Sequence, residues 1–224
     1  MSRLFILTIC SFLFITNLQA ERSFRILCFS VPAETPAEVE LSVNGNATGS
    51  IDLTRNRFSK TYTLDHSGPL KLTLSDKVYD DPEQLKDFPS VVIKESWKKF
   101  ILLAFPDPEN KNLPIRLVPM ELGNDFQNGD FRFINFLDNQ FAIKVGSKKT
   151  QLGSKEIKTM GNFAEQNQDV RMQISVFKPE AKIKVRPLAN QLIRYNKNMR
   201  VLFFMYQPKG SKRISYIAAD IRDM

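Results

Sequence analysis

The sequence predicts an all-β protein: two immunoglobulin-like β-sandwich domains in tandem, following a cleaved signal peptide. Two observations carry this prediction. Short runs that alternate polar and apolar residues recur along the chain, and Gly, Pro and Asn turn formers separate them. In addition, no amphipathic segment reaches the roughly twelve residues expected of the helices in βαβ units.

The chain begins with an export signal. Arg3 precedes the apolar run Leu4–Phe14, and Leu18-Gln19-Ala20 forms a cleavage site before Glu21. The run is eleven residues long, whereas a membrane-spanning helix needs about twenty. We therefore expect residues 1–20 to be removed rather than retained as an anchor. The mature chain is then exported, to the periplasm, the cell surface or the exterior, without a transmembrane segment.

Removal of the signal leaves Cys28 as the only cysteine, so no intramolecular disulfide can form and the fold depends on its apolar core. Cys28 lies in the first predicted strand, Phe24–Phe29. Alternation puts it on one face with Phe24 and Ile26, and places on the other face Arg25, Leu27 and Phe29. We expect a buried, inert thiol; the alternatives are a nucleophile or a site of intermolecular pairing.

Further strands follow in order along the first half. The alternating or apolar runs that predict them are Glu38–Val43, Arg57–Leu64, Leu70–Leu74, Val91–Ile93 and Phe100–Phe105. The last two are almost continuously apolar, as expected for strands covered on both faces. Short helical turns are predicted only within Asp81–Phe88 and Asn162–Gln168.

Turn-forming residues between Pro119 and Asp130 suggest a domain boundary, giving domains at 21–119 and 120–224. The charge supports this division. Residues 21–119 contain 13 Lys and Arg against 14 Asp and Glu, a net charge of −1, whereas residues 120–224 contain 18 against 10, a net charge of +8. The basicity of the protein therefore belongs to the second domain.

The best candidate for a binding surface is basic and lies within residues 178–213. In the run 182–186, three cations share one strand face, with Ile183 and Val185 opposite. This surface would attract an anionic envelope polymer or an acidic protein; the alternative is an ordinary solvated strand face. The residues predicted to bind are Lys182, Lys184, Arg186, Arg194, Lys197 and Arg200, and Lys209, Lys212 and Arg213 would enlarge the surface.

The residue inventory argues against several reaction types. His66 is the only histidine, so common zinc and blue-copper sites lack their ligands, and Asp65-His66-Ser67 is an unsuitable triad because triads assemble in space. The acidic segment Asp80–Asp87 lacks the EF-hand ligand order and is expected to be a solvated loop rather than a cation site. No cofactor or catalytic residue is predicted. Asn46-Ala47-Thr48 is a formal glycosylation sequon.

Nucleic acid is not expected as a partner. Phe203, Phe204 and Tyr206 offer rings for base stacking, but they stand in the apolar run Arg200–Tyr206, which is better explained as a buried strand.

Several segments of the second half carry a resemblance to known proteins. They are Asp130–Phe136, Phe141–Gly146, Leu152-Gly153, Arg186-Pro187-Leu188 and Arg200–Tyr206. Together they resemble an uncharacterised family of secreted bacterial β-sandwich proteins, of Verrucomicrobia-like sequence, over residues 128–222. The resemblance implies export and a β fold, and it supplies no reaction, ligand or catalytic residue.

These observations predict an exported, non-enzymatic structural or interaction protein of the cell envelope that binds an anionic partner. One alternative is a carbohydrate-active enzyme or carbohydrate-binding protein; an enzyme of this class would need two carboxylates across a cleft. Another is a periplasmic assembly chaperone, which donates a strand edge to an unfinished subunit. The chain lacks the proline-rich segment and the Leu-Pro…Arg-Glu-Ser-like stretch of pilus chaperones.

Overall fold

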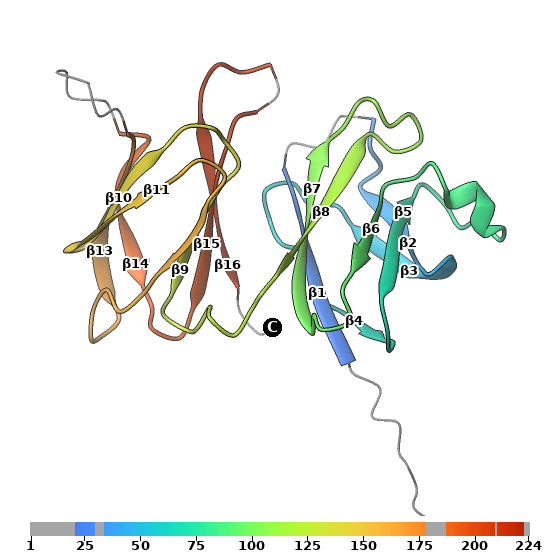
Figure 1. Cartoon of the computed structure of the whole chain (residues 1–224), viewed down its shortest axis with the longest axis horizontal. Helices are drawn as coiled ribbons and strands as arrows, with labels where there is room; N and C mark the ends of the chain where they lie inside the picture. Colours follow the sequence, from blue (N-terminus) through green and yellow to red (C-terminus); the bar gives the residue numbers. More distant parts are fainter. Residues whose placement is uncertain (1–20, 30–33, 178–186, 209, 222–224) are drawn as a thin grey trace, which may run out of the picture.

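The computed structural model describes residues 21–29, 34–177, 187–208 and 210–221. Within these ranges the chain forms two β-sandwich domains, which confirms the predicted all-β fold with two sandwiches in tandem (Figure 1). The strands of the first domain are β1 Glu21–Cys28, β2 Glu38–Val43, β3 Asn46–Asp52, β4 Tyr62–Asp65, β5 Leu70–Ser75, β6 Ser90–Ile93, β7 Lys99–Pro106 and β8 Ile115–Glu121. Those of the second are β9 Phe131–Asn135, β10 Phe141–Val145, β11 Lys148–Leu152, β12 Ile157–Met160, β13 Gln168–Val176, β14 Ala189–Tyr195, β15 Arg200–Tyr206 and β16 Ser215–Ile221.

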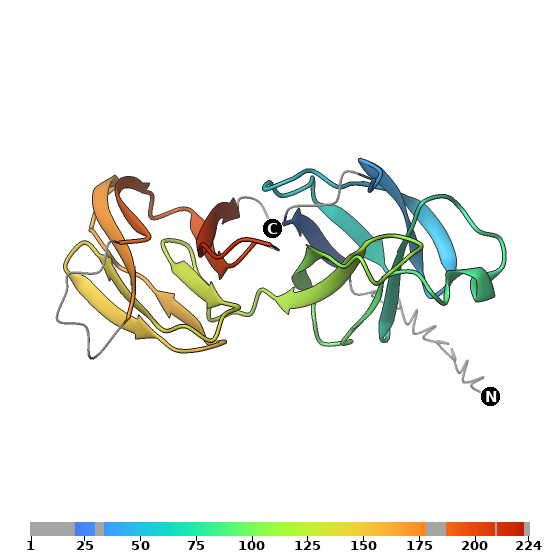
Figure 2. The same ribbon diagram turned by 90° about the horizontal axis from the view of Figure 1, so that it is seen from above.

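Each domain consists of two four-stranded sheets. We name them by their position relative to the other domain. In the first domain the N-inner sheet has the order β4-β1-β7-β8 and the N-outer sheet the order β3-β2-β5-β6. In the second domain the C-inner sheet is β12-β9-β15-β16 and the C-outer sheet is β11-β10-β13-β14. The two inner sheets face each other, and the outer sheets lie at opposite ends of an elongated molecule (Figures 1 and 2).

The two domains have the same topology. Every strand of the second domain takes the place, in its sheet, of the strand eight positions earlier in the chain. Pairing direction agrees as well, since β1 and β7 run parallel, with Leu27 opposite Leu103, and β9 and β15 run parallel, with Ile134 opposite Phe204. Matching the ladders aligns residues 24–29, Phe-Arg-Ile-Leu-Cys-Phe, with residues 131–136, Phe-Arg-Phe-Ile-Asn-Phe. The fold is thus an internal duplication.

Alternation along the inner strands separates three apolar cores. In β1, Phe24, Ile26 and Cys28 enter the core of the first sandwich, whereas Leu27 and the following Phe29 enter a core between the domains. β7 is buried on both faces in the same manner. The predicted faces of these two strands are confirmed. The prediction for Val91–Ile93 is wrong, because Val92 of β6 is 63% exposed and only one face of that strand is covered. The second sandwich has its own core, which includes Phe131 and Phe133.

The core between the domains is built from equivalent positions of the duplicated halves. The first domain contributes Leu27, Phe29, Ile101, Leu103, Phe105, Val118, Met120 and Leu122, and the corresponding residues of the second are Ile134, Phe136, Leu202, Phe204, Tyr206, Ile217, Ala219 and Ile221. Phe58 and Phe126 complete it. We call this set the interdomain core. Its burial on both sides holds the two sandwiches together.

Ring contacts in the interdomain core follow an approximate two-fold relation. Phe29 packs edge-on against Tyr206 with centroids 5.2 Å apart, and the equivalent residues Phe136 and Phe105 pack edge-on at 5.1 Å. Phe29 and Phe136 are equivalent to each other and meet at 6.1 Å, near the centre of this relation. Such self-complementary pairing is the hallmark of an isologous interface, here formed within one chain.

Some sequence predictions differ from the structure. The predicted helical turn at Asp81–Phe88 is a 3-10 helix at Pro82–Leu85, capped by the Asp81 side chain, which accepts a hydrogen bond from the Glu83 backbone. The second predicted turn is wrong: residues 162–167 form a loop that begins with Asn162 in a left-handed conformation. The predicted strand Arg57–Leu64 is paired as a strand only from Tyr62, with an isolated bridge at Phe58.

The predicted domain boundary at 119/120 lies inside β8, and the segment that joins the two sandwiches is 122–130. The expected signal peptide, residues 1–20, lies outside the described residues. In the described part of the chain, no helix has the length and apolarity needed to cross a membrane.

Candidate functional site

Of the six residues predicted to bind a partner, the structure describes three, and these three do not share one surface. Lys182, Lys184 and Arg186 lie outside the described residues. Arg194 lies on β14, on the solvent face of the C-outer sheet, and its guanidinium is 3.3 Å from a carboxylate oxygen of Asp169. Lys197 lies in the turn after β14, where its backbone N–H donates to the Asn167 side chain.

Arg200 belongs to a different part of the molecule. It begins β15 of the C-inner sheet, donates to the Phe126 carbonyl oxygen at 3.5 Å, and lies 5.6 Å from the centre of the Phe126 ring. Burial, and to a lesser extent the neighbouring Arg132, lowers the pKa of its guanidinium below the usual value. Arg200 therefore supports the edge of the interdomain core and is not a surface cation beside Arg194.

The solvent face of the C-outer sheet carries the cations that the structure does bring together. Residues paired across neighbouring strands point to the same face, so Lys149 of β11, Lys144 of β10 and Gln173 of β13 form one row. On the other face of the same strands, Ile143 and Met172 are fully buried in the core of the second domain. We call the solvent side the open face.

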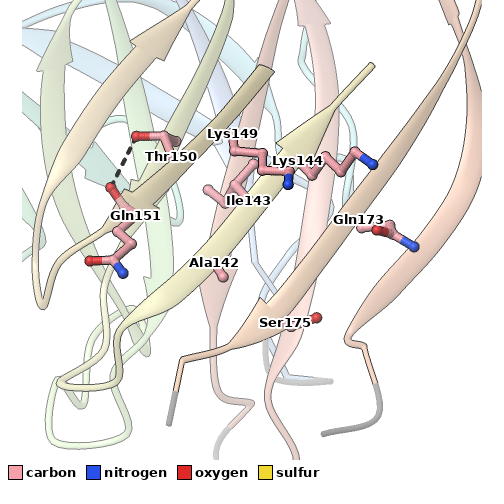
Figure 3. Close-up of a pocket in the computed structure, with 8 residues that line it drawn as sticks. All are labelled: Ala142, Ile143, Lys144, Lys149, Thr150, Gln151, Gln173 and Ser175. Atoms are coloured by element: carbon pink, nitrogen blue, oxygen red, sulfur yellow. Dashed lines mark hydrogen bonds between the residues drawn. The ribbon is translucent and has the colours of Figure 1, made fainter. Parts of the chain in front are cut away.

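The open face is hollowed where β10, β11 and β13 meet. The hollow has a volume of about 530 Å³ and is lined by Ala142, Ile143, Lys144, Lys149, Thr150, Gln151, Gln173 and Ser175. Figure 3 shows the Lys144 and Lys149 side chains next to each other at this hollow. Thr150 donates a hydrogen bond to the Gln151 carbonyl oxygen at its rim. The site is shallow and polar, suited to a ligand that lies on the sheet.

Lys144 and Lys149 are directly opposite each other in the antiparallel ladder. Like charges at such a pair destabilise the sheet, because their β-carbons are only about 5 Å apart. Among the described residues, no carboxylate lies within ion-pair distance of either ammonium. An anion bound between the two lysines would relieve their repulsion, which makes this pair the electrostatic centre of the site.

Two further cations of the open face are held in place by neighbouring side chains. Arg171 donates to the Asn190 side-chain oxygen at 3.0 Å, and the amide of Gln173 donates to the same oxygen at 3.3 Å. Arg194 is paired with Asp169, and both remain largely exposed. Counting outward-facing residues of the four strands, the open face carries four cations and one carboxylate.

The equivalent face of the first domain lacks the opposed pair of lysines. Matching the ladders places Ser42 at the position of Lys144 and Ala47 at that of Lys149, while Lys71 corresponds to Arg171. The lysine pair is thus present in only one copy of a duplicated surface. It was missed at the sequence level, although the two-residue Gly146-Ser147 turn between β10 and β11 fixes the register that opposes the two lysines.

A second hollow lies at the mouth of the interdomain core. Its volume is about 220 Å³, and its lining includes Phe29, Phe105, Phe136, Tyr206 and Arg116. The Arg116 guanidinium stacks on Phe105 at 4.9 Å from the ring centre. Burial raises the pKa of the Tyr206 phenol. The described residues that line this recess are predominantly aromatic and include no carboxylate.

Cys28 and His66 are the two residues that the sequence offered as possible nucleophile or triad member. Cys28 is buried, as predicted, and burial raises the pKa of its thiol to about 12, so it stays protonated at neutral pH. His66 Nε2 lies 2.8 Å from the Asn44 side-chain nitrogen beside the β2–β3 turn. Among the described residues, no three or more His, Cys, Asp or Glu side chains form a group able to hold a metal ion.

Comparison with known proteins gives no family. No family model matches the chain, and no curated protein matches it. Among solved structures, the chain is similar to the two C2 domains of Extended-Synaptotagmin 2, with 13% sequence identity and a TM-score of 0.21, over 91% of this chain and 90% of that one. At so low a TM-score, the similarity says nothing about the function of this chain.

Proposed function

We propose that this chain is an exported, non-enzymatic interaction protein of the cell envelope, and that it binds an anionic partner through the open face of the C-outer sheet. The main support is the Lys144–Lys149 pair: two positive charges that lie directly opposite each other on neighbouring strands, beside a hollow. Export rests on the sequence of residues 1–20. The concentration of positive charge in the second half supports an anionic partner.

The hollows of the described surface favour binding over hydrolysis. A glycosidase needs two carboxylates flanking the scissile bond. Four hollows of the described surface each have at most one carboxylate among their lining residues, such as Glu121 beside Lys98 and Asp220 beside Arg25. A binding role requires no such pair.

Charge reversal tests the proposal. The mature chain from Glu21 and its Lys144→Glu/Lys149→Glu variant are mixed with washed bacterial cell-envelope fragments, sedimented, and quantified in the pellet at low and high salt. We expect the variant to bind at least about tenfold more weakly, since two charge contacts become repulsive, and we expect salt to weaken binding of the parent.

The duplicated fold supplies a matched control. Lys71→Glu/Lys94→Glu makes the same change in net charge on the first domain, where Lys71 lies on β5 of the N-outer sheet, Lys94 directly follows β6, and both are exposed. This control is expected to sediment like the parent. Equal loss in both variants, or salt-insensitive binding that ignores Lys144 and Lys149, would contradict the proposal. Unchanged circular dichroism and melting temperature exclude unfolding as the cause.

A further inference from the structure

The four cations of the open face lie on one diagonal that crosses every strand of the C-outer sheet. Lys149 and Lys144 are opposite each other on β11 and β10. On β13, Arg171 is two residues from Gln173, the partner of Lys144, and on β14, Arg194 is two residues from Leu192, the partner of Arg171. The cations therefore advance one strand at a time, and from Lys144 onward each step also moves two residues along the strand.

Sheet geometry gives the scale of this diagonal. Strands are about 4.8 Å apart and two residues rise about 6.8 Å, so each diagonal step spans roughly 8 Å and the four cations extend over roughly 20 Å. A compact anion such as a single phosphate cannot contact a line of this length. The arrangement matches a linear chain with anionic groups at intervals, lying obliquely across the strands.

Uncharged hydrogen-bonding groups flank the cations. Gln173 and Asn190 continue the row that begins with Lys149 and Lys144, and the next row contains Gln151 and Ser175 around Ala142. Because the Asn190 side-chain oxygen accepts from both Arg171 and Gln173, it orders these two side chains before any ligand arrives. Amides and hydroxyls of this kind pair with the hydroxyl groups of sugars.

The outward-facing residues also argue against other polyanions. None of those described on β10, β11, β13 and β14 is aromatic, so the face offers no platform for stacking bases. Its one exposed large apolar side chain is Leu192, and peptide-binding grooves rely on several apolar anchors. An inorganic polyphosphate carries charge but no hydroxyl groups for the amides.

We infer that the ligand of the open face is an acidic polysaccharide, laid along the Lys149–Lys144–Arg171–Arg194 diagonal with its carboxylates at the cations and its hydroxyls at the flanking amides. This inference rests on the proposed function and narrows it to one class of anionic partner.

Binding of defined polymers tests the inference. Fluorescently labelled mature chain is titrated with polygalacturonate, poly-L-glutamate, inorganic polyphosphate and uncharged dextran, all at one ionic strength. We expect polygalacturonate to bind at least about tenfold more tightly than the other two polyanions, and dextran not to bind.

Two sets of variants test the amide contacts and the charge contacts separately. Gln151→Ala/Gln173→Ala is expected to weaken polygalacturonate binding about fivefold or more while leaving polyphosphate binding within twofold, because it removes amide contacts and no charge. Lys149→Ala is expected to weaken binding of every polyanion, whereas Lys148→Ala is not. Lys148 is the adjacent residue of β11 but pairs with buried Val145 and so belongs to the other face.

The failures of the two proposals are distinguishable. If polyphosphate or poly-L-glutamate binds as tightly as polygalacturonate, or the amide variant is silent, the polysaccharide assignment falls while a general anionic site remains. If Lys149→Ala and Lys148→Ala behave alike with all polymers, the open face is not the binding surface and both proposals fall.

Discussion

Truncating Phe29 tests whether the interdomain core couples the two sandwiches into one folding unit. The Phe29 ring is almost fully buried and packs against Phe105 of its own domain at 4.5 Å. It also contacts three rings of the other domain, Phe136, Phe204 and Tyr206, at 6.1, 5.4 and 5.2 Å. A Phe→Ala change in a core costs about 3–5 kcal/mol, so we expect Phe29→Ala to reduce the free energy of unfolding by about 4 kcal/mol.

The equivalent change in the second domain supplies the partner measurement. Phe136 is only partly buried but stacks on Phe204 and meets Phe105 edge-on, so Phe136→Ala is expected to cost about 3 kcal/mol. The double variant should lose less than the sum by about 0.5–1.5 kcal/mol, because the two rings contact each other and share neighbours.

The assay is urea unfolding followed by two probes. Fluorescence of Trp97, the only tryptophan, reports on the first domain, where it packs near Phe100, and far-ultraviolet circular dichroism reports on both domains. We expect the two transitions to coincide in the parent and to separate in Phe29→Ala. Phe88→Ala, which truncates a ring in the first core alone, should keep them coincident. A coincident transition in Phe29→Ala, shifted by less than about 1 kcal/mol, would refute this reasoning.

Three further predictions concern single residues. Because burial raises the pKa of Cys28 from 9.0 in an exposed thiol to about 12, the folded protein holds this proton where the unfolded chain has lost it. Its contribution to stability is therefore complete below pH 9 and lost as the pH rises from 9 to 12, and a thiol reagent at pH 8 should react only after denaturant is added. Arg132→Ala should lower the free energy of unfolding by about 2–4 kcal/mol in urea, because this buried guanidinium lies 4.4 Å from the Phe126 ring and donates to the Thr159 hydroxyl. Asp125→Asn changes its mostly exposed ion-pair partner and should cost under about 1 kcal/mol. Equal costs for the two variants would contradict the view that Arg132 stabilises the fold through its buried contacts. Gly129→Ala should lower the melting temperature far more than Gly68→Ala: both have positive φ, but a β-carbon at 129 would lie 2.8 Å from the Tyr195 hydroxyl oxygen while one at 68 meets open space.

Where a strand alternates clearly, its two faces could be predicted from the sequence, because alternation is a local signal; β3 and β8 lack so clear a pattern and were not predicted. The run 24–29 divides into two apolar faces by counting residues, and the structure buries both, one in a sandwich core and one against the other domain. What covers the second face depends on which sheets meet, and no local pattern records that. The repeat between residues 24–29 and 131–136 was the available hint, and it is short and separated by nearly a whole domain.

The candidate site was harder to predict because its charges come from different strands. Sequence proximity favoured the run Lys182–Arg186, which lies outside the described residues, and it grouped Arg200 with Arg194 although they belong to different sheets. The diagonal on the open face requires the pairings of β10 with β13 and of β13 with β14, which join residues distant in the chain. Only the Lys144–Lys149 opposition was accessible locally, through its two-residue turn.

The duplicated architecture has a consequence for how the two ends of the molecule respond to mutation. The interdomain core is built by residues of both copies, so a substitution at a ring such as Phe29, which contacts the other domain, disturbs the packing of both halves. The outer sheets are separated from that contact by the core of their own domain. One outer sheet can therefore carry a pair of lysines where the other has Ser and Ala without altering the contact between the domains. A single chain thus presents two end faces of different chemistry, one on each copy of the same fold.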